Sequence, residues 1–338
     1  MRWLACHPAP NFSVHDVHVG WVEALRTAGQ TVTEYPLGDV LTFYSEALLP
    51  AGDGRFRRAF DATTATAMAT DRLCAALYKV RPEVLLLTSG FFLDHQALAR
   101  ARRDGVRVVL LATEQPYERS RELALAEHCD VVVLNDPATL DDFRAVTTAW
   151  YQPHSYRSAL HAPGPAVGDL TCDLAFVGTG YPSRVGFLEE MGLDGLDVLL
   201  AGNWQLLTDD SPLRQFVAHD PAECMPNDRA VHIYRSMRVG LNLYRREGES
   251  SQGWSMGPRE VEMAACGGFF LRDPRPESDE TFPMLPTFTT PHEARELLRW
   301  WLNRPDQRTA AALKAREVIA DRTFDAAAAR LLRHLEGR

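Results

Sequence analysis

Short apolar runs alternate with helical patterns twice along this chain, and that alternation constrains the fold more than any other feature. In the first half, runs typical of buried strands occupy residues 3–6, 84–87, 106–111 and 131–134. Similar runs recur in the second half at residues 173–177, 197–201, 239–243 and 268–272. Strands that alternate with helices predict parallel, doubly wound sheets, and hence an α/β fold.

A proline-rich segment at residues 151–169 separates the two halves and lacks a periodic pattern. Because 338 residues exceed what one hydrophobic core usually holds, we expect two domains. We place an N-terminal Rossmann-like domain at residues 1–155 and a C-terminal one at residues 166–322. Ligands of open α/β sheets bind at the carboxyl ends of the strands, so those ends should line a cleft that both domains face.

The segment from Gly257 to Gly268 is typical of a helix that begins at Gly-Pro, ends at a glycine pair and leads into a buried strand. The N-terminus of such a helix presents free N–H groups and a positive dipole end to an anion such as phosphate. Glu262 lies one turn further along, where its carboxylate could accept hydrogen bonds from two ribose hydroxyls. These two features together suit a sugar nucleotide.

This segment resembles the donor-binding helix of GT-B glycosyltransferases, in particular the branch similar to the spore maturation protein CgeB. The pattern of that branch, Pro-Arg-x-x-Glu-x-x-Ala-Cys-Gly-Gly, is matched by Pro258, Arg259, Glu262, Ala265, Cys266, Gly267 and Gly268. The resemblance covers most of residues 170–335 and is thinner over the first 150. It implies a nucleotide-sugar on the C-terminal domain, an acceptor on the N-terminal domain, and a last helix at residues 323–338 that crosses back.

The turn that follows the strand at residues 173–177 is the second candidate phosphate contact. Glycine there lets the backbone approach a phosphate closely, and the resemblance implies that Gly178, Thr179 and Arg184 face the donor diphosphate. Arg184 and Arg259 suit that role because a guanidinium binds phosphate oxygens in a bidentate manner. A tight turn without a ligand is the alternative interpretation.

The nucleoside contacts are predicted from the same resemblance. Trp204 could stack on a base and Asn203 could hydrogen-bond to its edge, although a tryptophan that caps the core is equally consistent with the pattern. Tyr234 is a candidate for a donor-side contact or a core position, and Gly257 completes the helix start. Retaining GT-B enzymes often carry a second glutamate eight residues before the first; Trp254 stands there, which leaves the stereochemical outcome open.

The acceptor side rests on four candidate residues. His7 follows the first strand, His15 and Asp16 begin the next helix, and Glu114 follows the strand at residues 106–111. Histidine near neutral pKa, or a carboxylate, can deprotonate an acceptor hydroxyl. Exposed histidines and an aspartate that caps the helix are the alternative. His15 and His18 stand one turn apart and could bind a metal ion with His7, but two such histidines without a clear third ligand do not establish a site, so none is assigned.

Composition excludes several classes of protein. The net charge of −9 at pH 7 argues against a nucleic-acid surface, although nucleic acid stays possible as an acceptor. Six scattered cysteines without a CxxC pair fit a reduced cytoplasmic protein, and neither a signal-peptide core nor a membrane-spanning run is evident. The absence of a DxD triplet favours a reaction that needs no metal ion. The absence of a P-loop argues against nucleotide hydrolysis.

The sequence therefore predicts a metal-independent glycosyltransferase that uses a UDP-sugar or another NDP-sugar and a hydroxyl acceptor. Four alternatives stay open: a non-catalytic binding protein of the same fold, a DNA-modifying enzyme that acts on a hydroxymethylated base, a sugar-nucleotide epimerase, and an NAD-dependent oxidoreductase. The last is weakened because Ser183 replaces the third glycine of a GxGxxG motif and no acidic residue follows the next strand.

Overall fold

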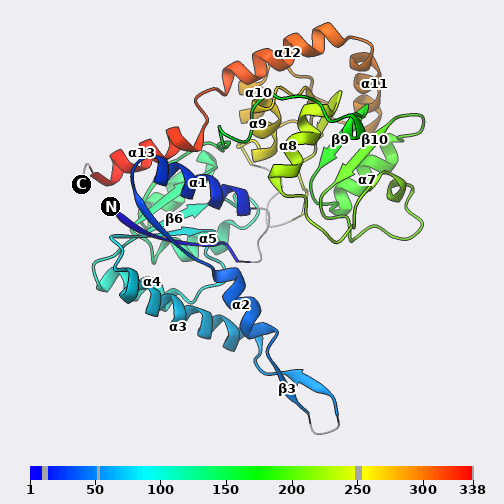
Figure 1. The fold of residues 1–338 in the computed structure, drawn as a ribbon. Coiled ribbons are helices and arrows are strands. Elements are labelled where there is room, and N and C mark those ends of the chain that lie inside the picture. Colours follow the sequence, from blue (N-terminus) through cyan, green and yellow to red (C-terminus); the bar gives the residue numbers. More distant parts are fainter. Residues whose placement is uncertain (10–13, 52–53, 248–252, 337–338) are drawn as a thin grey trace. The chain divides into compact units, whose positions relative to one another are not determined.

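The structure, a computed structural model, describes residues 1–9, 14–51, 54–247 and 253–336. The chain forms two compact units (Figure 1). The first unit comprises Met1–Gln152 together with the chain from Ala328 onward, and the second comprises Pro153–Ala327.

The first unit is built on a six-stranded parallel sheet in the order β2-β1-β5-β6-β7-β8. Its strands are β1 (Arg2–Cys6), β2 (Thr31–Tyr35), β5 (Val84–Thr88), β6 (Arg107–Ala112), β7 (Val131–Leu134) and β8 (Thr148–Tyr151). The central strands are covered on both faces, which explains their continuous apolar sequences. The four strands predicted in this half are confirmed.

Helices connect these strands, and polar side chains fix where several of them begin. The helices are α1 (His15–Thr27), α2 (Leu37–Ser45), α3 (Ala62–Val80), α4 (His95–Arg103), α5 (Arg119–Ala126) and α6 (Leu140–Arg144). The Asp61 side chain accepts from the Thr64 N–H at 2.7 Å, and Asp94 caps α4 through the Gln96 N–H at 2.9 Å. Between α2 and α3 lies a hairpin of β3 (Leu48–Pro50) and β4 (Phe56–Arg58).

The last helix, α13 (Phe324–Glu336), ends in the first unit. Arg330 Nε donates to Gln152 Oε1 at 3.0 Å, and Arg107 Nη1 donates to the Leu335 carbonyl at 2.9 Å. The His334 ring stacks on Trp150 with centroids 4.3 Å apart. These contacts fasten the end of the chain to β6 and β8.

The second unit holds a four-stranded parallel sheet in the order β10-β9-β11-β12. The strands are β9 (Leu174–Val177), β10 (Val198–Ala201), β11 (Val239–Asn242) and β12 (Phe270–Arg272). The helices are α7 (Pro182–Met191), α8 (Asn227–Ser236), α9 (Pro258–Ala265), α10 (Pro276–Thr281), α11 (Pro291–Leu302) and α12 (Pro305–Val318). The predicted strands and the predicted helix at Gly257 are confirmed.

Each sheet has one point where the strand order reverses. In the first unit β1 lies between β2 and β5, so the crevice opens beside the carboxyl ends of β1 and β5. In the second unit β9 lies between β10 and β11, so the crevice opens beside the ends of β9 and β11. These two edges carry most of the residues that the sequence singled out.

All six cysteines are free thiols. Among the helices of the described ranges, none has both the length and the apolar character needed to cross a membrane.

Candidate functional site

Two arginines meet at the strand-order reversal of the second unit. The Arg259 guanidinium, on the first turn of α9, packs so closely on Gly178 that a Cβ there would lie 2.5 Å from its Nη2. Arg259 Nη1 also donates to Asn242 Oδ1 at 3.2 Å, at the end of β11. Glycine at position 178 is therefore what allows this arginine to reach the crevice.

Arg184 is the buried partner in this arrangement, with 8% of its surface exposed. Its Nη1 donates to the Thr179 carbonyl at 3.0 Å and its Nε to the Leu243 carbonyl at 2.9 Å. It therefore ties the turn after β9 to the end of β11. Its guanidinium carbon lies 5.4 Å from the centre of the Phe176 ring, and that of Arg259 lies 5.3 Å from the same centre.

Two positive charges therefore converge on one aromatic ring. Among the described residues Arg259 has no carboxylate partner; its hydrogen bond goes to the neutral amide of Asn242. Two guanidinium groups held this close together create a positive potential that favours an anion. The site has the planar, multi-donor chemistry that suits a diphosphate.

The starts of the two neighbouring helices are held by carboxylates of the chain itself. Ser183, in the first turn of α7, donates its N–H and its hydroxyl to the two oxygens of Glu247, both at 2.9 Å. Burial would raise the pKa of Glu247, but these hydrogen bonds outweigh it and hold that pKa low. At α9, Glu260 accepts from the Gly257 N–H at 3.2 Å, which fixes the residue before Pro258.

Glu260 also connects α9 to residues outside this helix. It is fully buried and accepts from Ser278 Oγ at 2.6 Å and from the Tyr244 hydroxyl. Burial raises the pKa of this carboxyl group. Glu260 was not predicted as a site residue, because a glutamate in the first turn of a helix usually caps the helix and faces water.

Glu262 lies one turn beyond Arg259 on α9, and its carboxylate is held in a fixed orientation by α8. Asn227 Nδ2 donates to Oε1 at 2.9 Å, and the Tyr234 hydroxyl is 3.4 Å from Oε2. Burial and the Glu262 charge raise the pKa of Tyr234 well above its usual value, so Tyr234 remains a neutral donor. The structure thus gives Tyr234 the task of orienting Glu262, with Asn227 as a partner that the sequence did not reveal.

The position of Trp204 differs from the expectation that its ring stacks on a base. Its side chain is 0% exposed and meets Phe176 edge-on, with ring centroids 5.7 Å apart. A Cβ on Gly180 would lie 2.4 Å from the indole, so the ring is packed under the turn after β9. Trp204 is therefore a core residue, the alternative interpretation, and its ring has no exposed face for a base. Asn203 beside it donates to the Ala222 carbonyl at 3.2 Å.

In the first unit, His7 and His15 lie together near the strand-order reversal. His7 Nδ1 accepts from the Ala9 N–H at 3.2 Å, so the hydrogen of neutral His7 is on Nε2. That nitrogen is 2.8 Å from His15 Nδ1, which must then accept. Burial, together with the neighbouring His15, lowers the pKa of His7 and favours this neutral pair. Asp16 follows His15 directly, half-buried in the first turn of α1.

His18, which the sequence offered only as a possible metal ligand, extends the histidine pair. It is 1% exposed, with Nδ1 3.3 Å from Thr88 Oγ1 and Nε2 3.4 Å from a Glu34 oxygen. Burial lowers the pKa of His18 to about 4, so the ring is neutral at pH 7. It binds α1 to the ends of β2 and β5.

The backbone beside these histidines is strained. Ser89 at the end of β5 has φ of 63° and is 0% exposed, and Ala9 after β1 has φ of 64°. Residues other than glycine rarely adopt this left-handed conformation, and such strain concentrates at functional sites. The geometry supports a site at the reversal between β1 and β5.

Glu114 is placed by a buried carboxylate on α5. The Glu114 N–H donates to Glu122 Oε1 at 2.9 Å, and Gln115 Nε2 donates to Glu122 Oε2 at 2.6 Å. Glu122 is 0% exposed, and burial raises its pKa to about 8. No sequence signal marked Glu122, because a glutamate on a surface helix normally faces water.

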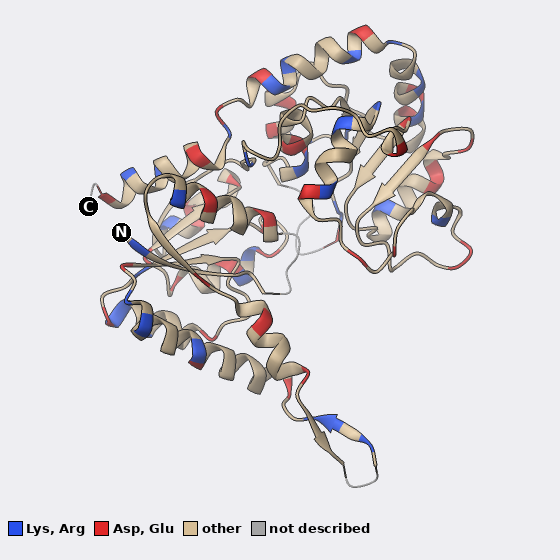
Figure 2. Cartoon of the chain, viewed as in Figure 1, with Lys and Arg blue, Asp and Glu red and all other residues tan. Residues whose placement is uncertain are grey.

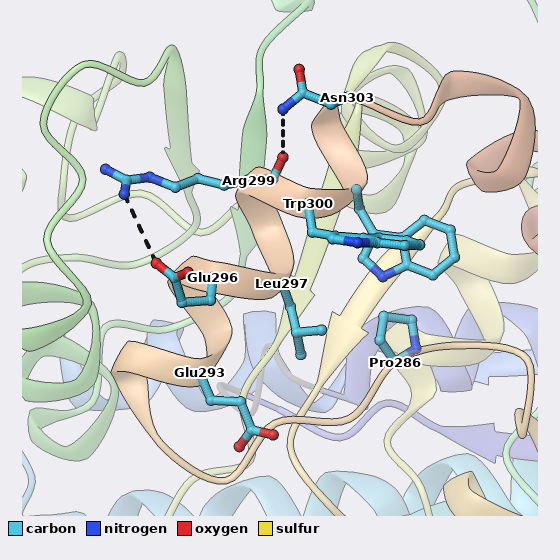
Figure 3. Close-up of a pocket in the computed structure, with 8 residues that line it drawn as sticks. Pro286, Glu293, Glu296, Leu297, Arg299, Trp300 and Asn303 are labelled. Carbon is cyan, nitrogen blue, oxygen red and sulfur yellow. Dashed lines mark hydrogen bonds and ion pairs between the residues drawn. The ribbon is translucent and has the colours of Figure 1, made fainter.

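A separate cavity of about 720 Å³ lies along α11 (Figure 3). Its lining includes Pro286, Leu297, Trp300 and Trp301, with Glu296 and Arg299 at its border. None of the predicted donor-site residues contributes to it. This cavity is therefore not part of the site formed by Gly178, Arg184 and Arg259.

Comparison with known proteins gives a family match over part of the chain and a fold. Residues 184–333 match the family model described as glycosyl transferase-like. No curated protein matches the chain. Among solved structures, sucrose-phosphate synthase from Thermosynechococcus elongatus is 15% identical, with full coverage of both chains and a TM-score of 0.64.

Two further structures show the same similarity. A putative UDP-N-acetylglucosamine 2-epimerase from Listeria monocytogenes is 13% identical, with 100% of this chain and 97% of that chain covered and a TM-score of 0.63. The Anabaena protein Alr3699/HepE, solved in complex with UDP and glucose, is 9% identical, with 98% and 99% coverage and a TM-score of 0.61. The chain has the GT-B fold. The predicted fold class is thus confirmed.

Proposed function

We propose that this GT-B protein is a glycosyltransferase that moves a sugar from a nucleotide-sugar to a hydroxyl acceptor. The observation that carries the proposal is the convergence of Arg184 and Arg259 on the turn at Gly178, with Glu262 one turn along α9. An anion-binding site and a carboxylate that can accept hydrogen bonds from hydroxyls lie in one crevice. They match the diphosphate and the ribose of a nucleotide-sugar. The glycosyl transferase-like match over residues 184–333 supports the same function.

The donor is proposed to be a UDP-sugar. HepE, which shares the fold, was solved with UDP and glucose. The diphosphate would lie against Arg259 and the turn at Gly178 and Thr179, with Arg184 holding that turn in place and the start of α9 at Gly257 and Pro258 adding its dipole. Arginines then stabilise the leaving diphosphate without a metal ion. Glu262 would accept hydrogen bonds from the ribose hydroxyls.

The acceptor is proposed to bind the first unit. The neutral His7–His15 pair has no open basic nitrogen between its members, because Ala9 and His7 occupy the two Nδ1 atoms. A carboxylate is therefore the better candidate to deprotonate the acceptor hydroxyl, and Asp16 and Glu114 are the two that the sequence predicts. The histidine pair would help to position the acceptor beside that carboxylate.

The motif at Pro258 also supports placing the chain with the CgeB-like branch, and the six free cysteines support the cytoplasm as its location. An epimerase remains the second candidate, because the putative UDP-N-acetylglucosamine 2-epimerase has the same fold at a TM-score of 0.63. It would use the same donor site without an acceptor. Incubation with UDP-sugars alone distinguishes the two: an epimerase changes the free donor, whereas a transferase needs a hydroxyl acceptor.

Thermal denaturation against UDP, GDP, ADP, dTDP, CDP and NAD, with and without magnesium, tests the donor site. UDP at 100 times its dissociation constant should stabilise the protein by about 2.7 kcal/mol. We expect the shift to be independent of magnesium, because arginines rather than a metal hold the diphosphate. A shift with NAD alone would identify an oxidoreductase instead, and no shift with any nucleotide would indicate a non-catalytic protein.

Glu262→Ala should weaken UDP-sugar binding by about 1–3 kcal/mol, the usual cost of losing a charged hydrogen-bond acceptor. Tyr234→Phe should cause a smaller loss, because Asn227 still holds the carboxylate. Isothermal titration with UDP-sugar and with a donor analogue that lacks the ribose hydroxyls measures both effects. The Glu262→Ala loss should disappear with the analogue; an equal loss for both ligands would refute the ribose assignment.

A further inference from the structure

The β3–β4 hairpin of the first unit stands apart from the rest of the fold. Within the part of the chain that the structure describes, β3 and β4 pair only with each other. The hairpin extends from α2 away from the six-stranded sheet (Figure 1). All six residues of Leu48–Pro50 and Phe56–Arg58 are exposed. An isolated two-stranded hairpin is marginally stable in water, so this one gains little from the core of its own chain.

Large apolar side chains face water on this hairpin. The exposed fractions are 68% for Phe56, 58% for Leu48 and 44% for Leu49, and Phe43 on the adjoining α2 is 66% exposed. The register pairs Pro50 with Phe56, so Leu48, Pro50 and Phe56 alternate onto the same face of the ribbon. Exposed apolar side chains that gather in one place mark an interaction surface.

The same hairpin is basic. Exposed Arg55, Arg57 and Arg58 flank Phe56, and Figure 2 shows the basic colour along β4. The whole chain carries a net charge of −9, so this local excess of positive charge opposes the rest of the molecule. A partner that complements the hairpin must therefore present both negative charge and an apolar interior.

Strand pairing with a second copy of the chain fits this hairpin poorly. β3 ends at Pro50, which has no N–H to donate to another strand. β4 carries Arg57 and Arg58, and charged side chains on an edge strand oppose pairing with the edge of another sheet. Two copies would also bring their arginines together. These features leave an anionic, apolar surface as the complement.

We propose that the β3–β4 hairpin docks the first unit on an anionic lipid bilayer. Phe56 and Leu48, which share one face of the ribbon, would enter the boundary between headgroups and acyl chains, and the arginines would bind lipid phosphates. An arginine near an anionic membrane surface strengthens binding by about fivefold, so Arg57 and Arg58 together account for about 25-fold. This inference is independent of the proposed function.

Co-sedimentation of the full chain with lipid vesicles tests the proposal. We expect binding to vesicles that contain phosphatidylglycerol, weaker binding to pure phosphatidylcholine, and a loss of binding as salt screens the arginines. The triple variant Phe56→Ser, Arg57→Ser, Arg58→Ser should bind anionic vesicles at least about 25-fold more weakly. Because all three side chains are exposed, its thermal midpoint should match that of the wild type.

A matched control removes the same chemistry elsewhere. Leu313, Lys314 and Arg316 are exposed on α12 of the second unit, and Leu313 is 54% exposed. Their triple serine variant should bind vesicles as the wild type does. Equal losses in both variants, or no binding of the wild type to anionic vesicles, would overturn the proposal. So would concentration-dependent dimers in sedimentation velocity that only the hairpin variant loses, since they would make a second copy the partner.

Discussion

Arg259→Ala should lower kcat/KM for sugar transfer by about 10²–10³-fold, the usual effect of removing a preorganised donor from developing negative charge. The proposed diphosphate would lose its guanidinium contact, and Arg184 cannot replace it because Arg184 is engaged with Thr179 and Leu243. Stability should change little, because Arg259 is half-buried and its hydrogen bond goes to one amide, that of Asn242.

Two companion variants sharpen this result. Arg259→Lys keeps the charge but not the bidentate fork, so we expect a loss between those of wild type and Arg259→Ala. Arg238→Ala is the matched control. Arg238 directly precedes β11, at the amino ends of the strands and away from the proposed site, and forms an ion pair with Asp173 at 2.6 Å. Steady-state kinetics of the three proteins should leave Arg238→Ala near wild type. If Arg259→Ala retained full activity, the crevice at Gly178 would not be the donor site.

The sequence predicted those strands that are buried on both faces. β5 is a continuous apolar run because helices cover both sides of it, and such runs stand out in any sequence. By contrast, β2 carries two threonines and a glutamate at exposed positions on an edge, and the hairpin strands are three residues long and exposed. Neither has an apolar run, so neither was predicted.

The candidate site divides in a similar way. Gly178, Arg259 and Glu262 could be selected because each belongs to a short local pattern of glycine, strand end and helix start. Asn227 lies 35 residues from Glu262, and no local pattern announces that its amide will hold that carboxylate. The packing of Trp204 under Gly180 is equally non-local, which is why the sequence allowed both a core and a ligand-facing position.

Gly202 links the packing of the second unit to the proposed donor site. It has φ of 110°, and a Cβ there would lie 2.5 Å from the carbonyl oxygen of Gly178. The two turns are also joined by hydrogen bonds from the Gly178 N–H to the Ala201 carbonyl and from the Gly180 N–H to the Asn203 carbonyl, both at 2.8 Å. Since the clash is with backbone, no side-chain rotation can relieve it.

Gly202→Ala should therefore destabilise the protein by about 2–4 kcal/mol, from the strained backbone and the overpacked turn together. It should also weaken UDP-sugar binding, because the turn that would move carries Gly178, on which Arg259 packs. Denaturant unfolding and titration with UDP-sugar measure the two effects on the same sample.

Gly186→Ala provides the opposite expectation within the same unit. Gly186 lies inside α7, and a Cβ there would meet no atom within 4 Å. Alanine at a helix interior should stabilise by about 0.5–1 kcal/mol and leave donor binding unchanged. If Gly202→Ala also unfolded within about 1 kcal/mol of the wild type, the turn could yield without cost, and the close contact with Gly178 would not be what holds the arginine site in shape.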